Sequence, residues 1–565
     1  MSATDVSFNL MDRPWLLVVM TDGSRRQLSI REVFEQADLI RGIDGDMPLQ
    51  RFALTRLLIA IVYATFGHNP SVDQWYALFD AGPRDSSVRE ALSEYCSAYR
   101  HRFDLFDDDA PFYQVAGLHT AKNEMFGLER LVLDAPSGAP FFTTRSGTGL
   151  STMSAAEAAR WLVTDQAFDP SGIKSGAVGD PRVKGGKGYP IGVAWSGHLG
   201  GYLVEGENLW QTLILNYVGS EVFGIDNPDA GWSDALDVPV WERPTLSESA
   251  EIGYDQPQER TGVTSYFHGP VTLMTWQSRR MLLAHDGETV TGVLICNGDR
   301  LKPQNANMDE TMTAWRRSEP QQKALKMPVV YMPRKHDPER ALWRGLPTLV
   351  IGEKHEQAHG DGPAETLCPL TLRWLSDKVR INDLPVRLHA FGVEYGSNEA
   401  VVDATVDDVL DLHLLVLSSQ APQLGQAVCQ AVAMVDDGIR ELRNLAGNIA
   451  NAAGLAAEPF RRQAGEAGYA TFDTVFREWV VGLDSGKDPE SAEREWNATA
   501  RRTLLELGGR FAAAAPSQAI VGRAVTFKNP KTGVATTTYY SVAAAENWYR
   551  NKIRRLIPVA PNEGE

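Results

Sequence analysis

The pattern of apolar and polar residues differs between the first 420 residues and the rest of the chain. In the first part, short alternating stretches and short apolar runs are separated by glycine-rich and proline-rich connections, without a regular βαβ order or an internal repeat. PWLLVVMTDGSRRQLSI predicts two short strands joined by an Asp-Gly turn. Ser29 and Glu32 predict a capping box for a helix over 31–40, and LQRFALTRLLIAIVYATF predicts a longer helix.

From residue 421 onward, apolar residues recur at steps of three and four, which is the spacing of one helix face. Four such stripes predict four helices, and long apolar stripes are expected to be core because water-exposed ones would promote aggregation. The stripes are Val428, Val432, Val435, Ile439, Leu442, Ala446 and Ile449; Phe472, Phe476, Trp479 and Leu483; Trp496, Ala500, Leu504, Leu507 and Phe511; and Val542, Ala545, Tyr549 and Leu556.

We therefore expect an α+β protein with two parts. A large, irregular mixed domain occupies residues 1–420, and a four-helix bundle occupies residues 421–565. The segment APSQAIVGRAVTFKNPKTGVATTTYY between the third and fourth stripes is long for a connection within a bundle. It is expected to form an arm of its own.

Length, composition and charge exclude some classes of protein function. With 565 residues, the chain exceeds what one hydrophobic core usually serves. A formal net charge of −17 argues against a protein that coats nucleic acid, so any contact with phosphate must be local. The four cysteines are far apart and form no C-x-x-C pair, which indicates buried thiols in a reducing compartment. An acidic N-terminus and the lack of an apolar run near ~20 residues predict a cytoplasmic protein with no membrane partner.

One string resembles a metal site. His355, Glu356 and His359 form an HExxH, the pattern in which a helix holds two histidines on zinc while the glutamate activates water. Here glycines stand on both sides of the string, a proline follows, and no apolar periodicity supports a helix. We favour a polar surface loop and keep a zinc-dependent hydrolase as the alternative.

A second unusual string is SGIKSGAVGDPRVKGGKGYPIG, over residues 171–192. Glycine allows close approach of a backbone to a surface, and the lysines indicate that this surface is anionic. The spacing fits neither G-x-x-x-x-G-K-[ST] nor G-x-G-x-x-G, so a nucleotide cradle is not predicted. Two interpretations remain: the segment contacts nucleic-acid phosphate, or it is a flexible linker.

Several longer blocks resemble one family. FNLMDRPWLLVV, LSIREVFEQADLIRGI and GDMPLQRFALTRLLIAI, followed by GHLGGYLVEGENLWQTLILN and DPERALWRGL, resemble CasA, the large subunit of Cascade, the type I-E CRISPR surveillance complex. The resemblance spans essentially the whole chain. It implies a non-catalytic subunit without metal or cofactor that recognises the protospacer-adjacent motif of target double-stranded DNA from the minor groove. It further implies that the subunit starts strand separation and R-loop formation and recruits a helicase-nuclease.

The resemblance also implies which residues contact the DNA. A glycine loop corresponds to PSGIKSG, with Gly172, Ser175 and Gly176 as the contacting residues. Without a side chain, glycine lets peptide groups reach base edges in a minor groove only about 6 Å wide.

Two further elements follow from the same resemblance. A lysine finger is assigned to Lys302, in preference to Lys323 and Lys326, and donates to acceptors on the groove floor. A strand-separating wedge corresponds to EYGSNEAVV and places Asn398 and Glu399 beneath the first target base pair. The family typically has glutamine where Glu399 stands, and a carboxylate there would be repelled by phosphate.

The partners implied are other Cascade subunits, the CRISPR guide RNA, the target duplex and the helicase-nuclease. The resemblance implies that Phe141, Phe142, Thr143 and Arg145 contact the guide RNA handle or anchor the subunit. The alternative for Phe141 and Phe142 is a core strand. Contacts with displaced DNA or neighbouring subunits are implied for Arg550, Lys552, Arg554 and Arg555. The alternative for the last group is a set of solvated cations that compensate the helix dipole.

Overall fold

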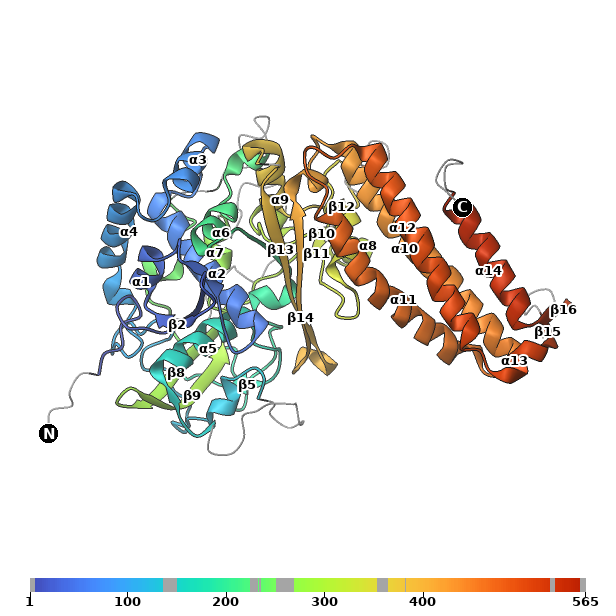
Figure 1. Cartoon of the computed structure of the whole chain (residues 1–565). Helices are drawn as coiled ribbons and strands as arrows, with labels where there is room; N and C mark the ends of the chain where they lie inside the picture. The colour runs from blue at the N-terminus through green and yellow to red at the C-terminus, as the bar shows by residue number, and fades with distance from the viewer. Residues whose placement is uncertain are drawn as a thin grey trace. The chain divides into compact units, whose positions relative to one another are not determined.

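The structure is a computed structural model that describes residues 6–135, 150–223, 232, 235–249, 269–352, 364–381, 383–528 and 534–558. The chain divides into two compact units. The first unit comprises 1–340, 354–381 and 385–409, and the second comprises 341–353, 382–384 and 410–565. The predicted class, a mixed α+β region followed by C-terminal helices, is confirmed (Figure 1). The second unit also takes in a segment well before residue 421.

The first sheet of the first unit has the order β2-β1-β3, with strands β1 (Leu16–Met20), β2 (Arg25–Leu28) and β3 (Ile40–Ile43). The predicted strand pair and the capping box of Ser29 and Glu32 are confirmed. The predicted helix over 31–40 is too long, because α1 (Ile30–Glu35) ends five residues earlier. Ile40 pairs with Met20 on β1 instead, so sheet formation outweighs local helix propensity there.

Helix α2 (Pro48–Phe66) is the central helix of the first unit. The expectation that no run approaches a membrane span is wrong for this helix, whose length and mean hydropathy of 1.3 would allow it to cross a membrane. In the structure 78% of that stretch is buried inside the protein, as in the core helix of a globular domain. Arg56 on α2 is also buried and forms a two-pronged ion pair with Glu310, with both distances 2.8 Å.

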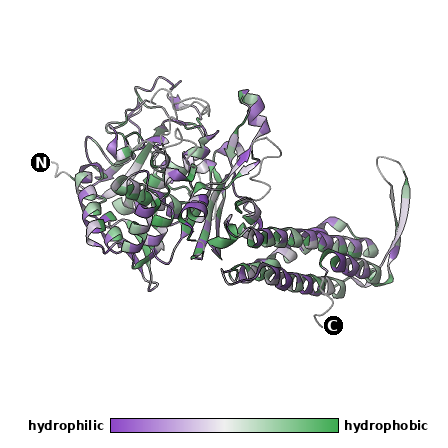
Figure 2. Cartoon of the chain, turned by 90° about the horizontal axis from the view of Figure 1, so that it is seen from above, coloured by the Kyte–Doolittle hydropathy of each residue, from purple (hydrophilic) through white to green (hydrophobic). Residues whose placement is uncertain are grey.

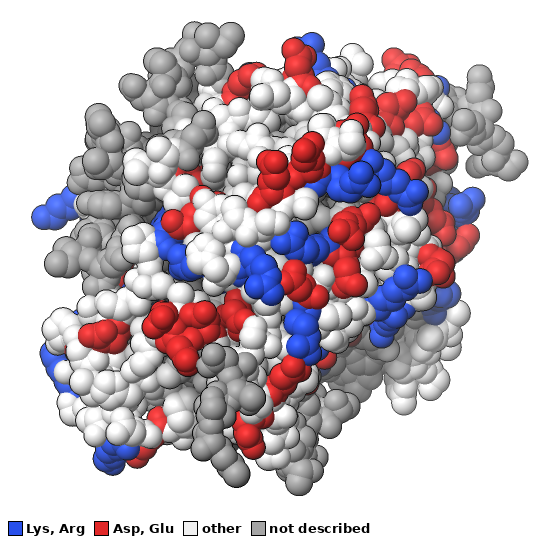
Figure 3. All heavy atoms as spheres, turned by 90° about the vertical axis from the view of Figure 1, so that its left-hand side faces the viewer, with Lys and Arg blue, Asp and Glu red and all other residues white. Residues whose placement is uncertain are grey.

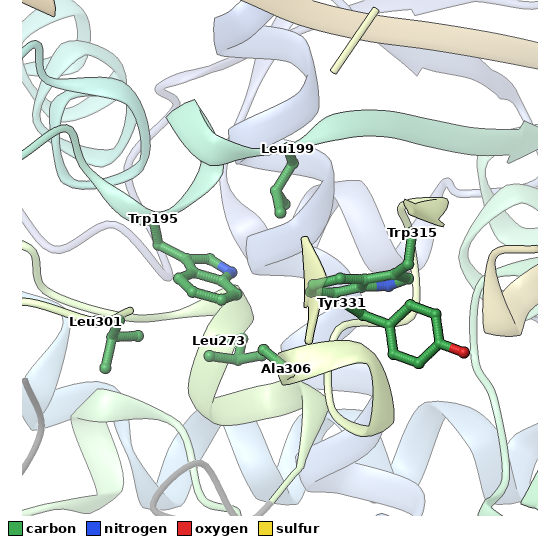
Figure 4. Packing of buried hydrophobic residues seen from close by; sticks show 7 residues of the cluster. All are labelled: Trp195, Leu199, Leu273, Leu301, Ala306, Trp315 and Tyr331. Carbon is green, nitrogen blue, oxygen red and sulfur yellow. The ribbon is translucent and has the colours of Figure 1, made fainter. Parts of the chain in front are cut away.

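The other helices of this unit are α3 (Val72–Ala81), α4 (Ser86–Ala98), α5 (Ala155–Phe168), α6 (Leu209–Leu215), α7 (Pro270–Met274), α8 (Glu319–Leu325) and α9 (Leu370–Arg373). Short turns of 3₁₀ helix, such as η4 (Trp195–His198), connect them. A buried cluster joins η4 to later segments (Figure 4): its members are Trp195, Leu199, Leu273, Leu301, Ala306, Trp315 and Tyr331.

Three further sheets complete the first unit. One joins β4 (Met153–Ser154), β5 (Lys174–Ser175), β6 (Lys187–Gly188), β8 (Arg279–Asp286) and β9 (Thr289–Asn297). A second has the order β14-β13-β7, with β7 (Gly200–Glu205), β13 (Pro385–Tyr395) and β14 (Val402–His413). A third has the order β11-β10-β12, with β10 (Trp315–Arg317), β11 (Tyr331–Pro333) and β12 (Thr366–Leu367).

In the second unit, α11 (Ala457–Val480), α12 (Pro489–Ala513) and α14 (Val542–Leu556) pack against the long helix α10 (Pro422–Ala453). The whole first stripe, from Val428 to Ile449, is buried as predicted. Figure 2 shows hydrophobic and hydrophilic residues on different sides of these helices. The long link contains α13 (Ser517–Val521) and a hairpin of β15 (Arg523–Lys528) and β16 (Ala535–Tyr540).

A segment from before the bundle completes this core. The 3₁₀ helix η8 (Leu342–Thr348) places Trp343 against Phe476 on α11, with stacked rings 4.7 Å apart. The indole nitrogen of Trp343 donates to Asp473, 2.9 Å away. These contacts explain why residues 341–353 belong to the second unit.

Candidate nucleic-acid interface

The glycine-rich segment leaves the end of α5 and contains two different kinds of essential glycine. Gly172 has φ +146°, a backbone conformation that L side chains rarely adopt, and no neighbouring atom lies within 4 Å of the place of a Cβ. At Gly176, a Cβ would lie 2.5 Å from Val183 and 2.7 Å from the backbone of Gly186. Gly172 is therefore required by its backbone conformation and is open to approach, whereas Gly176 is required by packing within the loop.

The rest of the loop folds back on this start. Ser175, on β5, pairs with Cys296 on β9 and with Lys187 on β6. Lys184 and Lys187 exchange two backbone hydrogen bonds of 3.0 and 3.2 Å, and both side chains are exposed. The loop therefore has ordered backbone contacts and is not simply a flexible linker.

A buried ion cluster lies beneath the loop. Asp169 accepts from Lys174, 2.7 Å away, and from the guanidinium of Arg279. Although burial opposes it, these two cations hold the pKa of the Asp169 carboxyl below its usual range. Burial raises the pKa of Asp165 well above its ordinary value, and the charge of Asp169 adds to that effect. Lys174 and Arg279 therefore both lie against the Asp169 carboxylate beneath the loop.

The segment that carries Lys302 lies against the same loop. Arg182 donates to the carbonyl oxygens of Gly298 and Asn297, 3.0 and 3.2 Å away. Leu301 is buried in the cluster that contains Trp195, so the residue before Lys302 is fixed in the core (Figure 4). Lys302 itself is half-buried.

The third predicted element is the turn between β13 and β14. The hydroxyl of Tyr395, the last residue of β13, donates to the carbonyl oxygen of Phe168 at the end of α5. Asn398 and Glu399 follow with φ values of +57° and +54°, and both side chains are exposed. Asparagine tolerates this left-handed conformation, whereas glutamate does so at a cost. The tip is consequently exposed on a hairpin whose base is anchored.

Cations gather where these segments meet. Burial and the charges of Lys335, Arg300 and Arg279 lower the pKa of His198 to about 3. Lys335 lies over the ring of Tyr395, 5.3 Å from its centroid. On the face shown in Figure 3, by contrast, acidic and basic side chains are interspersed. Lys335, Arg300 and Arg279 therefore form a group of cations around the buried His198.

The structure brings three of the predicted groups into one unit. The loop that contains Gly172, Ser175 and Gly176 contacts the segment before Lys302 through Arg182. The hairpin that carries Asn398 and Glu399 contacts the end of α5, just before that loop. The alternative lysines, Lys323 and Lys326, lie on α8 and at its C-terminal end.

Two other predicted groups lie outside the described residues. These are the guide RNA contacts Phe141, Phe142, Thr143 and Arg145, and the HExxH of His355, Glu356 and His359. Among the residues that the structure describes, no group of three or more histidine, cysteine or acidic side chains could hold a metal ion. The hydrolase alternative rests on residues that are not described.

The cations of the last helix form a separate surface in the second unit. Arg550, Lys552, Arg554 and Arg555 are all exposed on α14. Arg550 pairs with Glu546, 2.8 Å away, and lines a groove of about 550 Å³ between α12 and α14 together with Arg501 and Arg502. Arginines from two helices therefore line the same groove.

Sequence reasoning missed several residues of the first unit's site. Arg130 lies 3.4 Å from the hydroxyl of Ser175, and Lys335, Arg300 and Arg279 place positive charge near the buried His198. One signal was present in TWQSRRMLL, where two adjacent arginines precede an apolar strand. A charged pair at that position indicates specific buried partners.

Comparisons with known proteins give matches over most of the chain. The model of the family described as CRISPR-associated protein Cse1 matches residues 9–507. A crystal structure of Thermobifida fusca Cse1 is 39% identical, with a TM-score of 0.86, and the match covers 99% of this chain and 100% of that chain.

Two further comparisons are more distant. CRISPR-associated protein CasA/Cse1 of Thermus thermophilus is 26% identical over 314 residues, which span only 55% of this chain and 55% of that protein. A chain in a structure described as a CRISPR RNA-guided surveillance complex is 19% identical, with a TM-score of 0.65, and the match covers 97% of this chain and 99% of that chain. This last likeness concerns the fold.

Proposed function

The chain belongs to the family of CRISPR-associated protein Cse1, and on this premise we propose that it is the large subunit of an RNA-guided type I-E Cascade complex. In this proposal it recognises the protospacer-adjacent motif of target double-stranded DNA from the minor groove. It acts without catalysis of its own, in the cytoplasm. Its partners are other Cascade subunits, the CRISPR guide RNA, the target DNA and a helicase-nuclease.

One observation carries the proposal. It is a pair of contacts between distant parts of the chain: Tyr395 at the base of the hairpin bonds to Phe168, just before the glycine loop, over 227 residues, and Arg182 in that loop bonds to Asn297 over 115. In the proposal, the glycine loop, Lys302 and the hairpin tip together contact one stretch of duplex. Guide pairing reads most of the target, so the protein itself needs only a small site.

The chemistry of each element suits the minor groove. The open backbone at Gly172 can approach base edges without a side chain in the way. The ammonium of Lys302 donates hydrogen bonds, and the groove floor presents acceptors in a degenerate pattern. Recognition by these groups would tolerate several related motifs.

The hairpin tip would begin strand separation. Asn398 and Glu399 protrude from a turn whose base is tied to α5 through Tyr395. Unstacking one base step costs a few kcal/mol, roughly, which guide pairing and backbone contacts offset. A rigid exposed turn can act sterically, so the carboxylate of Glu399 need not bind DNA.

Two further surfaces would complete the subunit. Phe141, Phe142, Thr143 and Arg145 would hold the guide RNA handle or a neighbouring subunit. The cations of α14, Arg550, Lys552, Arg554 and Arg555, would contact the displaced strand. R-loop formation would then deliver the DNA to the helicase-nuclease.

The test uses the reconstituted complex and two duplexes that differ only in the flanking motif. Lys302→Ala and Gly172→Ala are each compared with Lys378→Ala, which removes a lysine from another part of the same unit. We expect the first two to weaken binding of the motif-bearing duplex by about tenfold and the control to have no effect. Equal binding of both duplexes by the unaltered complex would refute the proposal.

A further inference from the structure

The buried side chain of Arg279 connects the two ends of the glycine-rich loop. Arg279 begins β8, and its side chain is only 1% exposed. One terminal nitrogen donates to the carbonyl oxygens of Asp169, Pro170 and Gly192, at 3.3, 3.2 and 2.8 Å. Its Nε donates to the Asp169 carboxylate. Asp169 and Pro170 immediately precede the loop, and Gly192 ends it.

The backbone of Arg279 is also fixed. The side-chain amide of Gln166 on α5 donates to the carbonyl of Arg279, 3.0 Å away, and accepts from its N–H at 2.8 Å. On β9, Asn297 pairs with Arg279 in the sheet and leads directly into the segment that carries Lys302. Arg279 therefore contacts both ends of the loop through its side chain. Through its backbone it pairs with Asn297, at the start of the segment that carries Lys302.

We propose that Arg279 is a positioning residue for DNA recognition: it fixes the distance between the loop ends and holds the loop beside the Lys302 segment before DNA binds. This inference rests on the proposed function. Arg279 does not touch DNA in this account. It acts through the backbone of residues 169–192, and a preformed site loses less free energy to ordering when it binds.

The geometry distinguishes positioning from charge balance. If Arg279 served only to neutralise Asp169, a lysine would suffice, because its ammonium keeps the charge. Arg279 contacts three carbonyl oxygens from both ends of the loop. These contacts require a planar guanidinium with several donors, and the ammonium of lysine, on its flexible side chain, does not reproduce them. Arg279→Lys therefore removes positioning while it keeps the ion pair.

The experiment compares two targets in the assembled complex. A motif-bearing duplex requires the loop, whereas a single strand complementary to the guide pairs without motif recognition. We expect Arg279→Lys to weaken duplex binding by about tenfold while single-strand binding stays within about twofold of the unaltered complex. Arg160→Lys is the matched control, because Arg160 is buried on α5 and donates to Trp15 and Ala156, away from the loop.

The other possible outcomes test the inference and the proposed function separately. Equal loss of duplex and single-strand binding would show a general structural role and overturn the inference. Unchanged duplex binding by Arg279→Lys, while Gly172→Ala and Lys302→Ala weaken it, would overturn the inference but keep the proposed function. No effect of any of the three would contradict the proposed function itself.

A second variant keeps the inference testable if Arg279→Lys fails to assemble. Gln166→Met removes the amide that holds the backbone of Arg279 but leaves the guanidinium and its ion pair in place. We expect a smaller loss, of about threefold, that is confined to the duplex target. Loss on both targets, or on neither, would count against Arg279 as a positioning residue.

Discussion

The hydroxyl of Tyr395 donates a hydrogen bond of 2.6 Å to the carbonyl oxygen of Phe168, and the two residues lie 227 positions apart in the chain. The bond ties the end of β13 to the last residue of α5, directly before the glycine-rich loop begins. Burial raises the pKa of Tyr395 well above its ordinary value, so the phenol stays protonated and can donate. One contact therefore joins the base of the hairpin to the end of α5, which leads into the loop.

Removing this hydroxyl should loosen the coupling. Tyr395→Phe keeps the ring and removes the donor, which we expect to cost about 1 kcal/mol of folding stability. Tyr76→Phe is a matched control, because the hydroxyl of Tyr76 donates to the carbonyl of Val379 over the same 2.6 Å. Both variants should lose similar thermal stability. Only Tyr395→Phe should also weaken binding to motif-bearing duplex, and equal binding by both variants would argue against the coupling.

The carboxylate at the hairpin tip should oppose DNA binding. Glu399→Gln keeps the size of the side chain and removes a negative charge, so duplex affinity should rise by about threefold at low salt and less at high salt. Titrations at two salt concentrations measure this difference. A lower affinity in Glu399→Gln would mean that the carboxylate itself makes a favourable contact.

The backbone of the same residue offers an independent prediction. Glu399 has φ +54°, which glycine adopts without strain, so Glu399→Gly should stabilise the first unit by about 1 kcal/mol. Ala400→Gly, one residue along and with φ −91°, should give no such gain. Denaturant unfolding compares the two variants, and equal effects would contradict the strain assigned to Glu399.

A buried histidine predicts how stability depends on pH. His389 lies between Glu205 and Asp407 and bonds to both carboxylates. Burial alone would lower the pKa of His389, but these two hydrogen bonds raise it above its ordinary value of 6.5. A raised pKa in the folded state stabilises the protein below about pH 6.5, and this contribution is lost as the pH rises through the folded value.

Thermal unfolding between pH 6 and pH 9 tests this sign. The unaltered chain should lose stability across that window, and His389→Gln should show a flatter profile because no imidazolium remains to be deprotonated. Asp407→Asn should reduce the slope by part of that amount, since one of the two carboxylates remains. Identical slopes in His389→Gln and the unaltered chain would contradict the assignment.

The cations of α14 should act on the displaced strand and not on folding. All four side chains are exposed, so replacing them with glutamine should leave the thermal stability of the bundle nearly unchanged. Fewer cations should shorten the lifetime of the R-loop and reduce its dependence on salt. The four residues are Arg550, Lys552, Arg554 and Arg555.

The matched control changes four arginines on α10 and α11 instead. These are Arg440, Arg443, Arg461 and Arg462. R-loop dissociation should be faster only for the α14 variant. If both sets shorten the lifetime equally, net charge and not a specific surface controls it.

Local patterns in the sequence predicted much of the fold. The capping box at Ser29 and Glu32 and the stripe from Val428 to Ile449 are properties of residues three or four apart, so one sequence reveals them. The helix expected over 31–40 failed where Ile40 pairs with Met20, because that contact depends on a partner twenty residues away. Contacts between residues that are far apart in the sequence are correspondingly harder to predict from it.

The candidate site, like the fold, could be predicted from the sequence only where local patterns determine it. The glycines and lysines of residues 171–192 pointed to an interface, but the role of Gly176 depends on Val183 and Gly186 folding back over it. Arg279 contacts Asp169 from 110 residues away, and no local pattern records that pair. The hydropathy of α2 likewise does not show that the helix is buried in the protein, because a membrane-spanning helix would have the same hydropathy.

In the proposed function, the glycine loop, Lys302 and the hairpin tip contact the same few base pairs. Photocrosslinking in the assembled complex tests it most directly, with one crosslinking amino acid placed at Ser175, Lys302 or Asn398 and, as a control, at Lys378. The first three positions should crosslink to the flanking motif and the first target base pair, and the control should not crosslink there. Crosslinks from the three positions to unrelated parts of the DNA, or to none, would contradict it.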